Sequence, residues 1–462
     1  MNDVLDLLQE IERYCQANNM APSTFGRQAV NDGKFVGRLR EGGNVTMTTL
    51  ARVRGFIDGD AVSVADPIAA AAPSTPALQP PPVSDDTSSS RNFRFYDNRQ
   101  KYLMFVNTCS EKRVVAERVG QELVRINPAP PALRLFDAGM GDGTVLTSVM
   151  RQMHRRFPTY PFFVVGKEIS LEDVRLSLEK MSDRFFEHPA TVLVLTNLYY
   201  SESPWLKPGT MQAAASLNWI EQPLAGTSAH EFDEQISDMQ ETLAECWQVR
   251  YSEKTGNPLY VRPSVLVLYR DDHKFLLDPV IPRIGSAHAD YDIVIASQPY
   301  RARQSAEFKV EKVLAPLAKS LAPGGRLLVI QSHGGDPGLE IVRRVWPGEA
   351  PFRSDRHELI KVMKQQLGRT HRDLKYGSYA DARSVFQYQM HTLPTEIGLG
   401  QQIGTSTLLA AWNAATYVAQ IEDSRLEDVM SGHDYLDATR DVLAEYGGLW
   451  FNDEAFVVSR RR

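Results

Sequence analysis

The sequence predicts an α/β fold with a doubly wound, mostly parallel sheet, preceded by a small all-α domain. Short apolar runs are separated by stretches with helical periodicity, and this alternation is typical of βαβ units. One of these runs leads into three closely spaced glycines, which predicts a strand, a tight turn and a helix in succession. A stretch rich in Ala, Pro and Ser divides these patterns from an N-terminal segment that has helical periodicity alone.

Composition is ordinary for a globular protein of two or three domains. The chain has 462 residues, of which 43% are hydrophobic and 23% are charged. Its net charge of −6 does not indicate that the chain as a whole binds a polyanion. Cys15, Cys109 and Cys246 lie far apart, without metal or disulfide spacing, which fits a reducing compartment. No basic leader and no bilayer-length apolar run is present. We therefore expect a cytoplasmic protein with no metal site and no membrane partner.

Residues 1–58 are predicted to form a small helical domain. Apolar residues recur at helical spacing in its first helix, which contains Val4, Leu7, Leu8, Ile11 and Tyr14. Ser23 is a predicted cap for a second helix, residues 31–33 break that helix, and a third helix follows. The expected inward side chains of these two helices are Phe25, Ala29, Val36 and Leu39, and a last apolar pattern contains Leu50, Val53, Phe56 and Ile57.

Two short helices joined by a tight turn resemble a helix-turn-helix of the phage-repressor type. The resemblance implies possible DNA binding through residues 23–54. Lys34, Phe35, Gly37, Arg38 and Arg40 would lie on or near the exposed face of the second helix of the pair, and Arg27, Arg52 and Arg54 would meet phosphates. Val30 stands where the family usually has glycine. The alternative is a helical interaction or dimerisation module.

Residues 59–91 are predicted to be a disordered linker. They are rich in Pro, Ala, Ser and Asp, and they offer few apolar side chains that would offset the entropy of ordering. The main domain is therefore expected at residues 92–462.

The main domain is predicted to begin with a helical lead-in and to continue as alternating strands and helices. Strands are expected at 133–136, 162–166, 191–200, 291–300 (the strand and its end) and 326–330, and late strands at 384–393 and 448–461. Residues 200–288 exceed what a single crossover helix needs, so we expect a folded insertion that recognises substrate. The polar residues of this insertion that could recognise substrate are Arg270, Asp271, Asp272 and His273. A salt-bridged surface hairpin explains these four residues equally well.

The glycine-rich turn carries the strongest motif. Asp137 ends the first strand, and Gly139, Gly141 and Gly143 follow at alternate positions. A dinucleotide-binding turn would need G-x-G-x-x-G, but Thr144 stands at its third glycine. The spacing D-x-G-x-G-x-G resembles motif I of class I S-adenosylmethionine (SAM) dependent methyltransferases. The alternatives are an ordinary strand-to-helix turn and another nucleotide-type cofactor.

Three further features occur in the order of this family. Glu168 follows the second strand, where an acidic residue accepts hydrogen bonds from ribose hydroxyls. Ser297-Gln298-Pro299-Tyr300 follows the fourth strand and resembles motif IV, with Gln298 at the position of the first proline in amino-group methyltransferases. Pro-Gly-Gly at 323–325 precedes the fifth strand.

The resemblance implies a seven-stranded Rossmann-like methyltransferase sheet, with the last strand antiparallel, and SAM as cofactor. The implied cofactor-binding residues are Asp137, Gly139, Gly141, Asp142, Gly143, Glu168, Asn197 and Ser297, with Asn197 and Leu198 beside the adenine. Tyr300, Gln298 and His333 are the candidates on the acceptor side. Tyr96 and Tyr102 would reach the sulfonium with an aromatic face, or else only pack in the core or at the surface.

The function that the resemblance implies is methyl transfer from SAM to an N, O or C atom, most simply of a small molecule. The alternative is a DNA-binding protein whose methyltransferase domain modifies nucleic acid or senses SAM as a transcriptional regulator. A base methyltransferase needs a pocket for a flipped base and a basic channel. The acidic net charge and Gln298 argue against that alternative.

Overall fold

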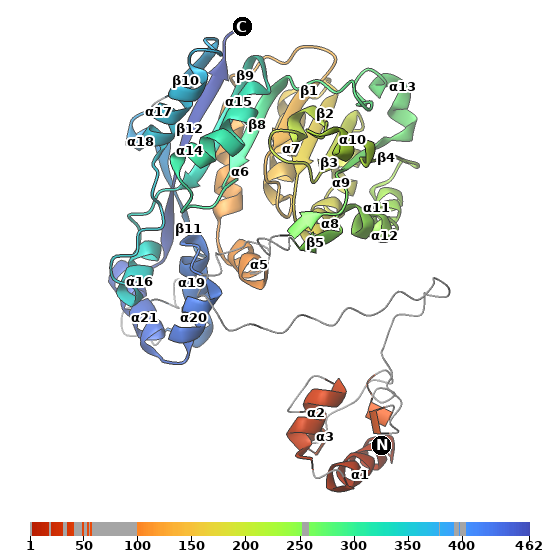
Figure 1. Cartoon of the computed structure of the whole chain (residues 1–462), viewed down its shortest axis with the longest axis vertical. Coiled ribbons are helices and arrows are strands. Elements are labelled where there is room, and N and C mark those ends of the chain that lie inside the picture. Colours follow the sequence, from red (N-terminus) through yellow and green to blue (C-terminus); the bar gives the residue numbers. More distant parts are fainter. Residues whose placement is uncertain are drawn as a thin grey trace. The chain divides into compact units, whose positions relative to one another are not determined.

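The computed structural model describes residues 2–17, 20–30, 35–40, 49, 53–54, 56–57, 99–251, 258–377, 379–391, 397 and 403–462. It divides into two compact units, Met1–Ser88 and Ser89–Arg462 (Figure 1). The predicted linker at 59–91 and Tyr96 lie outside the described residues.

The N-terminal unit contains the helices α1 Asn2–Ala17, α2 Pro22–Val30 and α3 Phe35–Arg40. Its core contains the side chains that the periodicity places inward, among them Leu7, Ile11, Phe25, Ala29, Val36, Leu39 and Val53. Phe35 is also buried, at 6% exposure, so the prediction of an exposed Phe35 is wrong: this ring completes the core instead. The turn at 31–33, Lys34 and Arg52 lie outside the described residues.

The main unit contains a ten-stranded, mostly parallel sheet with the order β10-β12-β9-β8-β1-β2-β3-β7-β4, in which β11 also pairs with β12. The strands are β1 Leu133–Asp137, β2 Phe162–Lys167, β3 Thr191–Thr196, β4 Asn218–Leu224, β7 Ser264–Arg270, β8 Tyr291–Ser297, β9 Leu321–Ser332, β10 Leu374–Gly377, β11 Val385–Gln389 and β12 Trp450–Arg460. A separate hairpin pairs β5 Val249–Tyr251 with β6 Pro258–Tyr260.

The prediction of seven strands is therefore wrong for the complete sheet. The seven predicted strands correspond to β1, β2, β3, β8, β9, β11 and β12, with β12 antiparallel to both β9 and β11, and β10 was not predicted. The insertion adds β7, antiparallel to β3, and then β4, parallel to β7. In addition, β11 pairs with one half of β12, and β10 pairs with the other half. The two added strands cover the apolar edge of β3, which would otherwise present unpaired backbone groups.

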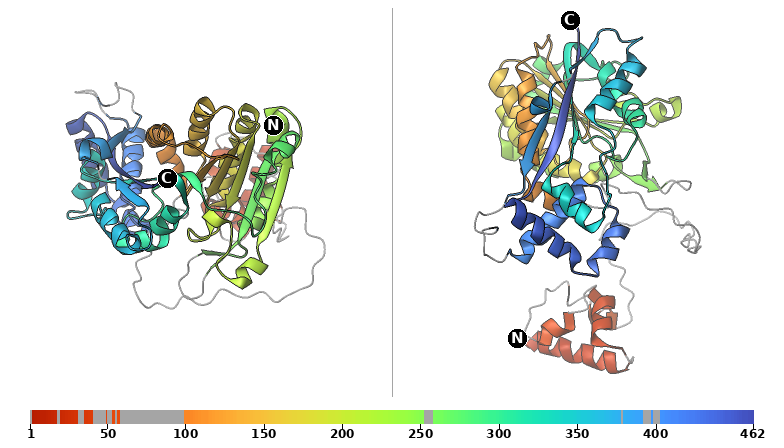
Figure 2. Two further views of the ribbon diagram at one scale, coloured as in Figure 1. Left: turned by 90° about the horizontal axis from the view of Figure 1, so that it is seen from above. Right: turned by 90° about the vertical axis from the view of Figure 1, so that its left-hand side faces the viewer.

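The main unit has helices on both faces of the sheet and a further group of helices that packs against β11 (Figure 2). The helices of the main unit are α5 Arg99–Thr108, α6 Glu111–Leu123, α7 Thr144–Arg156, α8 Leu171–Glu179, α9 Ser182–Glu187, α10 Met211–Ala215, α11 Ala229–Ser237, α12 Gln240–Cys246, α13 Lys274–Leu277, α14 Ala306–Lys309, α15 Ala315–Lys319, α16 Pro337–Val345, α17 Arg356–Leu367, α18 Asp381–Ser384, α19 Thr405–Val418, α20 Asp423–Met430 and α21 Asp434–Tyr446. Short helical turns η1 Ser203–Trp205, η2 Asp271–His273 and η3 Val310–Leu314 complete the set. None of the described helices has both the length and the apolar character to cross a bilayer.

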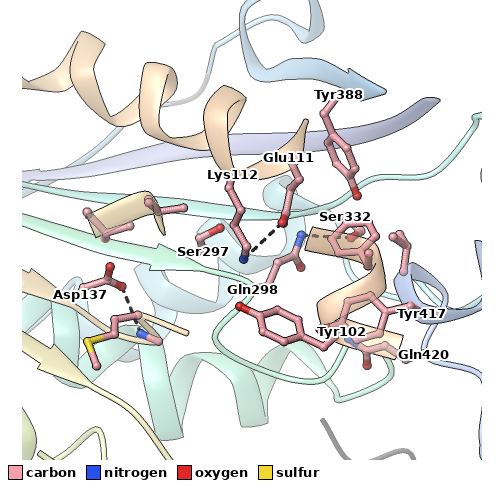
Figure 3. Close-up of a pocket in the computed structure, with 16 residues that line it drawn as sticks. Tyr102, Glu111, Lys112, Asp137, Ser297, Gln298, Ser332, Tyr388, Tyr417 and Gln420 are labelled. Carbon is pink, nitrogen blue, oxygen red and sulfur yellow. Dashed lines mark hydrogen bonds and ion pairs between the residues drawn. The ribbon is translucent and has the colours of Figure 1, made fainter. Parts of the chain in front are cut away.

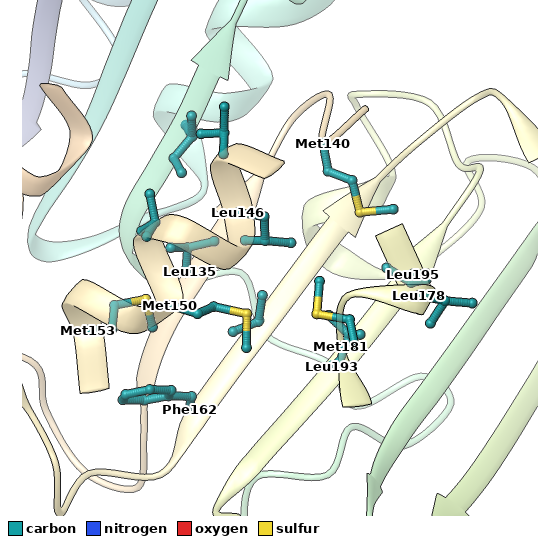
Figure 4. Close-up of a cluster of buried hydrophobic side chains, with 14 of the residues drawn as sticks. Leu135, Met140, Leu146, Met150, Met153, Phe162, Leu178, Met181, Leu193 and Leu195 are labelled. Atoms are coloured by element: carbon teal, nitrogen blue, oxygen red, sulfur yellow. The ribbon is translucent and has the colours of Figure 1, made fainter. Parts of the chain in front are cut away.

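The central strands are apolar on both sides because each side packs against helices. On one face, Leu135 of β1, Phe162 of β2 and Leu193 of β3 contact α7 and α8 (Figure 4). On the other face, residues of the same strands pack with α15 and α17. A third cluster joins α5, α16, α19 and α21 to β11. These three clusters hold the carboxyl ends of β1, β2 and β8 at one edge of the sheet.

Candidate functional site

Two adjoining cavities open at the carboxyl edge of the sheet. We call the first the aromatic cavity, with about 640 Å³ of unfilled space, and the second the β2 cavity, with about 860 Å³. Both are lined by Tyr102, Lys112, Gly139, Ser297, Gln298 and Tyr417. The aromatic cavity further includes Phe105, Glu111, Asp137, Met140, Ser332, Tyr388 and Gln420 (Figure 3). The β2 cavity further includes Gly141, Lys167, Glu168, Ile169, Ser170, Asp173, Tyr200 and Pro299.

The glycine-rich turn puts backbone, and no side chain, at the meeting point of the cavities. A Cβ at Gly139 would meet no protein atom within 4 Å, so the space above Gly139 is open. Glycine is required at position 143 for a different reason. The φ of Gly143 is +76°, and a Cβ there would lie 2.9 Å from the Cα of Ser177. Gly143 thus lets α8 approach the turn closely, and it does not line either cavity.

Asp142 supports the turn from behind. Its carboxylate accepts hydrogen bonds from Lys180 Nζ at 2.8 Å and from the hydroxyl of Thr144 at 2.5 Å. Burial alone would raise the pKa of Asp142, but the hydrogen bonds from Lys180 and Thr144 outweigh burial and lower it. Asp142 is therefore a charged anchor at the start of α7, outside the residues that line the cavities.

Asp137 ends β1 inside the aromatic cavity. Its Oδ1 accepts a hydrogen bond from the Gly139 N–H at 3.3 Å, and only 2% of the residue is exposed. Burial raises the pKa of Asp137 to about 7, because the hydrogen bond from Gly139 and the charge of Lys112 offset only part of the desolvation. A cation bound beside Asp137 would favour its ionised form.

Glu168 joins the end of β2 to the glycine-rich turn. Its Oε2 accepts from the Gly141 N–H at 2.8 Å, and its Oε1 accepts from the N–H groups of Ile169 and Ser170 at 2.6 and 2.9 Å. Burial, followed by the charge of Asp173, raises its pKa. Beside it, burial lowers the pKa of Lys167 to about 8, and Lys167 Nζ lies 4.8 Å from the ring centroid of Tyr200.

The turn after β8 is held on two sides. Gln298 has a positive φ of 50°, which is uncommon outside glycine. Its Nε2 donates a hydrogen bond to Ser332 Oγ at 3.1 Å (Figure 3) and another to Asp453 Oδ1 at 3.3 Å. The carbonyl of Pro299 accepts a hydrogen bond from Tyr200 at 2.9 Å. Ser297 and Gln298 are thereby fixed between the two cavities.

The start of α6 supplies an ion pair that the sequence analysis missed. Lys112 Nζ lies 3.3 Å from Glu111 Oε2 and 5.4 Å from the ring centroid of Tyr102 (Figure 3). Burial alone would lower the pKa of Lys112, but the charge of Glu111 outweighs it and the pKa lies well above its ordinary value. The segment Ser110-Glu111-Lys112-Arg113 reads as an ordinary helix start, so no sequence signal distinguishes this pair from exposed charges.

Aromatic side chains from distant segments form the remaining walls. Tyr102 of α5 and Tyr417 of α19 line both cavities, and Tyr388 of β11 lines the aromatic cavity. The Tyr102 hydroxyl accepts a hydrogen bond from the Asp142 N–H at 3.3 Å. Tyr102 was predicted either to reach the cofactor or only to pack in the core or at the surface, and its position in both cavities agrees with the first interpretation. The sequence did not predict that Tyr388 and Tyr417 would line a cavity.

Besides Asp142 and Gly143, three further predicted site residues lie outside the residues that line the cavities. The Asn197 side chain donates to the carbonyls of Cys246 and Arg262 and accepts from the Ser264 N–H at 2.8 Å, so it fastens the insertion to β3. The hydroxyl of Tyr300 donates to Gln331 Oε1 at 3.0 Å within the core. His333 Nδ1 lies 3.5 Å from Glu454 Oε2.

The polar residues of the insertion also lie away from the site. Because β7 runs antiparallel to β3, its carboxyl end lies at the opposite edge of the sheet. Arg270 pairs with Asp272 at 2.5 Å, and His273 also contacts Asp272. The structure therefore places these residues outside the lining of both cavities and agrees with their interpretation as a salt-bridged turn.

No protein-family model matches the chain, and no curated protein matches it in sequence. Among solved structures, a geranyl diphosphate methyltransferase in complex with SAM is 11% identical over 75% of this chain and 85% of that chain, with a TM-score of 0.29. The same enzyme with GPP and sinefungin is 12% identical over 74% and 76%, with a TM-score of 0.28. The rRNA methyltransferase aviRa from Streptomyces viridochromogenes is 18% identical over 47% and 73%, with a TM-score of 0.21.

Proposed function

We propose that the main unit is a methyltransferase that moves a methyl group from SAM to an N, O or C atom of a small molecule. One observation carries this proposal. The D-x-G-x-G-x-G turn, Glu168 and the Ser297–Pro299 turn come from three strands, and they line two joined cavities at one edge of the sheet. Ligands of open α/β sheets bind at this edge, where strand order reverses around the first strand.

The residues present fit SAM part by part. The open space above Gly139 admits the methionine chain, and Glu168 would accept from the ribose hydroxyls. Ile169 and Tyr200 line the same cavity and would flank the adenine. Lys112, which keeps its positive charge, would pair with the methionine carboxylate, and Asp137 would face the ammonium group.

The sulfonium of SAM supplies a methyl group that is already activated for direct in-line transfer. The chain therefore has to align the acceptor with the methyl group and exclude water. The Ser297–Pro299 turn is suited to this task because hydrogen bonds to Ser332, Asp453 and Tyr200 fix it. A general base is needed only where the acceptor must lose a proton at the operating pH.

A small acceptor agrees with the lining of the site. The walls of the aromatic cavity combine rings with a few polar groups, as in small-molecule pockets. Cys15, Cys109 and Cys246 are all free, buried thiols, which supports a reducing compartment, and we propose the cytoplasm for this reaction.

DNA binding by the N-terminal unit is the alternative, in which the main unit modifies nucleic acid or senses SAM as a regulator. The packing of α2 and α3 in one core agrees with a helix-turn-helix. However, Arg40 pairs with Glu12 and Arg54 pairs with Glu10, which reduces the positive charge available to phosphates. DNA affinity that falls steeply with salt, and that is lost on deletion of residues 1–58, would support this alternative.

The test uses methyl-labelled SAM with the purified full chain and a cytoplasmic extract. We expect label in the small-molecule fraction. Label on nucleic acid would favour the alternative, and SAM binding without transfer would favour a sensor. Calorimetry measures SAM binding separately: Asp137→Ala with Glu168→Ala should abolish it, while Asp272→Asn, far from both cavities, is the matched control. Retained binding in the double variant contradicts the assigned site.

A further inference from the structure

We propose that the methylated atom is a nitrogen that carries hydrogen, and that Asp453 selects it by orienting Gln298. This inference rests on the proposed methyltransferase function and names the acceptor class for the same site. It depends on the direction in which the Gln298 amide faces and on the groups around the aromatic cavity.

The amide of Gln298 presents its oxygen to the acceptor. Its Nε2 is used by Ser332 Oγ and Asp453 Oδ1, whereas none of the hydrogen bonds among the described residues uses its Oε1. Gln298 lines both cavities, so its oxygen is a free acceptor at the point where they meet. An N–H donor is the complementary partner for an amide oxygen.

Asp453 fixes this orientation from inside the protein. It lies on β12 and has no exposed surface, and its Oδ1 accepts the amide N–H of Gln298 at 3.3 Å. Turning the amide would take Nε2 away from both Ser332 Oγ and Asp453 Oδ1. Gln298 also has a positive φ, a backbone conformation that costs free energy in a residue other than glycine. Such strain is common at functional sites, which agrees with a functional role for Gln298.

The rest of the aromatic cavity suits an amine with an apolar or planar body. The rings of Phe105 and Tyr417 lie 5.0 Å apart between centroids, and those of Phe105 and Tyr388 lie 6.1 Å apart. Glu111, only 5% exposed, lines the same cavity and is paired with Lys112. The faces of the rings attract a polarised N–H group.

An oxygen acceptor fits less well. A hydroxyl would have to lose its proton during the attack. Glu111 is already paired with Lys112, and His333 lies outside the residues that line the cavities. A neutral amine instead keeps its lone pair while one N–H bonds to Gln298. Its nitrogen attacks the methyl carbon, the C–N bond forms as the C–S bond breaks, the bonding pair stays on sulfur, and the surplus proton leaves to solvent.

The first test identifies the atom that receives the methyl group. The full chain is incubated with ¹³C-methyl SAM and the small-molecule fraction of a cytoplasmic extract, and the carbon chemical shift of the product methyl is measured by NMR. An N-methyl product supports the inference. An O-, S- or C-methyl product overturns it and leaves the methyltransferase function standing. Absence of transfer despite SAM binding overturns both.

The second test asks whether Asp453 acts through Gln298. Gln298→Leu should lower the initial rate by about 10- to 100-fold while SAM affinity by calorimetry stays within about twofold. Asp453→Asn should lower the rate by about three- to tenfold, because its amide gives Gln298 a donor as well as an acceptor. In the Gln298→Leu background, Asp453→Asn should have no further effect.

Independent, multiplicative effects of the two substitutions would overturn the role of Asp453 as a positioning residue. Should Asp453→Asn fail to fold, Ser332→Ala removes the other anchor of the amide and takes its place in the cycle. Asp272→Asn again serves as the control for both measurements.

Discussion

Gly139 and Gly143 lie in one turn, but they are needed for different reasons. At Gly143 the backbone and the neighbouring helix exclude a side chain, whereas at Gly139 a Cβ would meet no protein atom within 4 Å, and the space opens into both cavities. The two residues can therefore be used to separate binding from stability.

We expect Gly139→Val to lower SAM affinity by at least about tenfold, because its methyl groups would enter the space between the cavities. Its melting temperature should stay close to that of the unmodified chain. Gly143→Ala is the control, and strain at φ +76° together with the contact to Ser177 should destabilise it by about 1–3 kcal/mol. Calorimetry and thermal unfolding measure the two effects; undiminished SAM binding by Gly139→Val would contradict the site.

Asp137 makes binding of a cation depend on pH. Its raised pKa of about 7 means that the carboxyl is protonated below pH 7 and ionised above it. Because the ammonium of SAM favours the ionised form, we expect SAM affinity to fall as pH decreases from 7.5 to 6, by at most about tenfold per pH unit. Asp137→Asn should bind more weakly and lose this dependence. A slope that persists in Asp137→Asn would assign the titration to another group.

At the scale of elements, a buried ion pair connects α17 to β12. Arg356 Nη1 lies 2.9 Å from Glu454 Oε2, and the two side chains are 2% and 1% exposed. Glu454 Oε1 also accepts from the Arg356 N–H and from Gln331 Nε2 of β9. Glu454 thus joins three elements next to the strand that carries Asp453.

We expect Glu454→Gln to destabilise the main unit by about 3 kcal/mol, since it leaves the charge of Arg356 buried without its inner partner. Urea unfolding measures the change. Asp381 contacts the same guanidinium but is 79% exposed, so Asp381→Asn should have little effect. If both variants lost the same free energy of unfolding, burial would not explain how much the Arg356–Glu454 ion pair stabilises the main unit.

At the scale of the whole molecule, each of the two units has a core of its own. Among the residues that the structure describes, the apolar cluster of the N-terminal unit contains only residues from 7 to 57, and the three clusters of the main unit contain only residues from 105 onward. Each unit therefore has the packing that independent folding requires.

We expect a chain of residues 89–462 to keep its melting transition and its SAM affinity within about twofold of the full chain. Any DNA affinity of the full chain should be absent from this fragment. Circular dichroism, calorimetry and a salt-dependent DNA titration measure these properties. Loss of SAM binding in a folded fragment would show that the N-terminal unit completes the site.

The sequence by itself determined the features that are local. The glycine-rich turn, Glu168 and Ser297–Gln298 could be predicted because each is a short motif directly after an apolar strand, and parallel strands bring their carboxyl ends together. The five parallel strands β1, β2, β3, β8 and β9 could also be predicted, because each is a short apolar run. These features depend on spacing along the chain.

Only the tertiary structure decided which distant side chains complete the site. Glu111, Lys112, Tyr388 and Tyr417 come from α6, β11 and α19, and Asp453 comes from β12, with no local pattern to distinguish them. The antiparallel direction of β7 likewise placed Arg270 and its neighbours away from the site. The physical reason is that sheet pairing and helix packing join segments hundreds of residues apart, whereas a sequence motif records only neighbours.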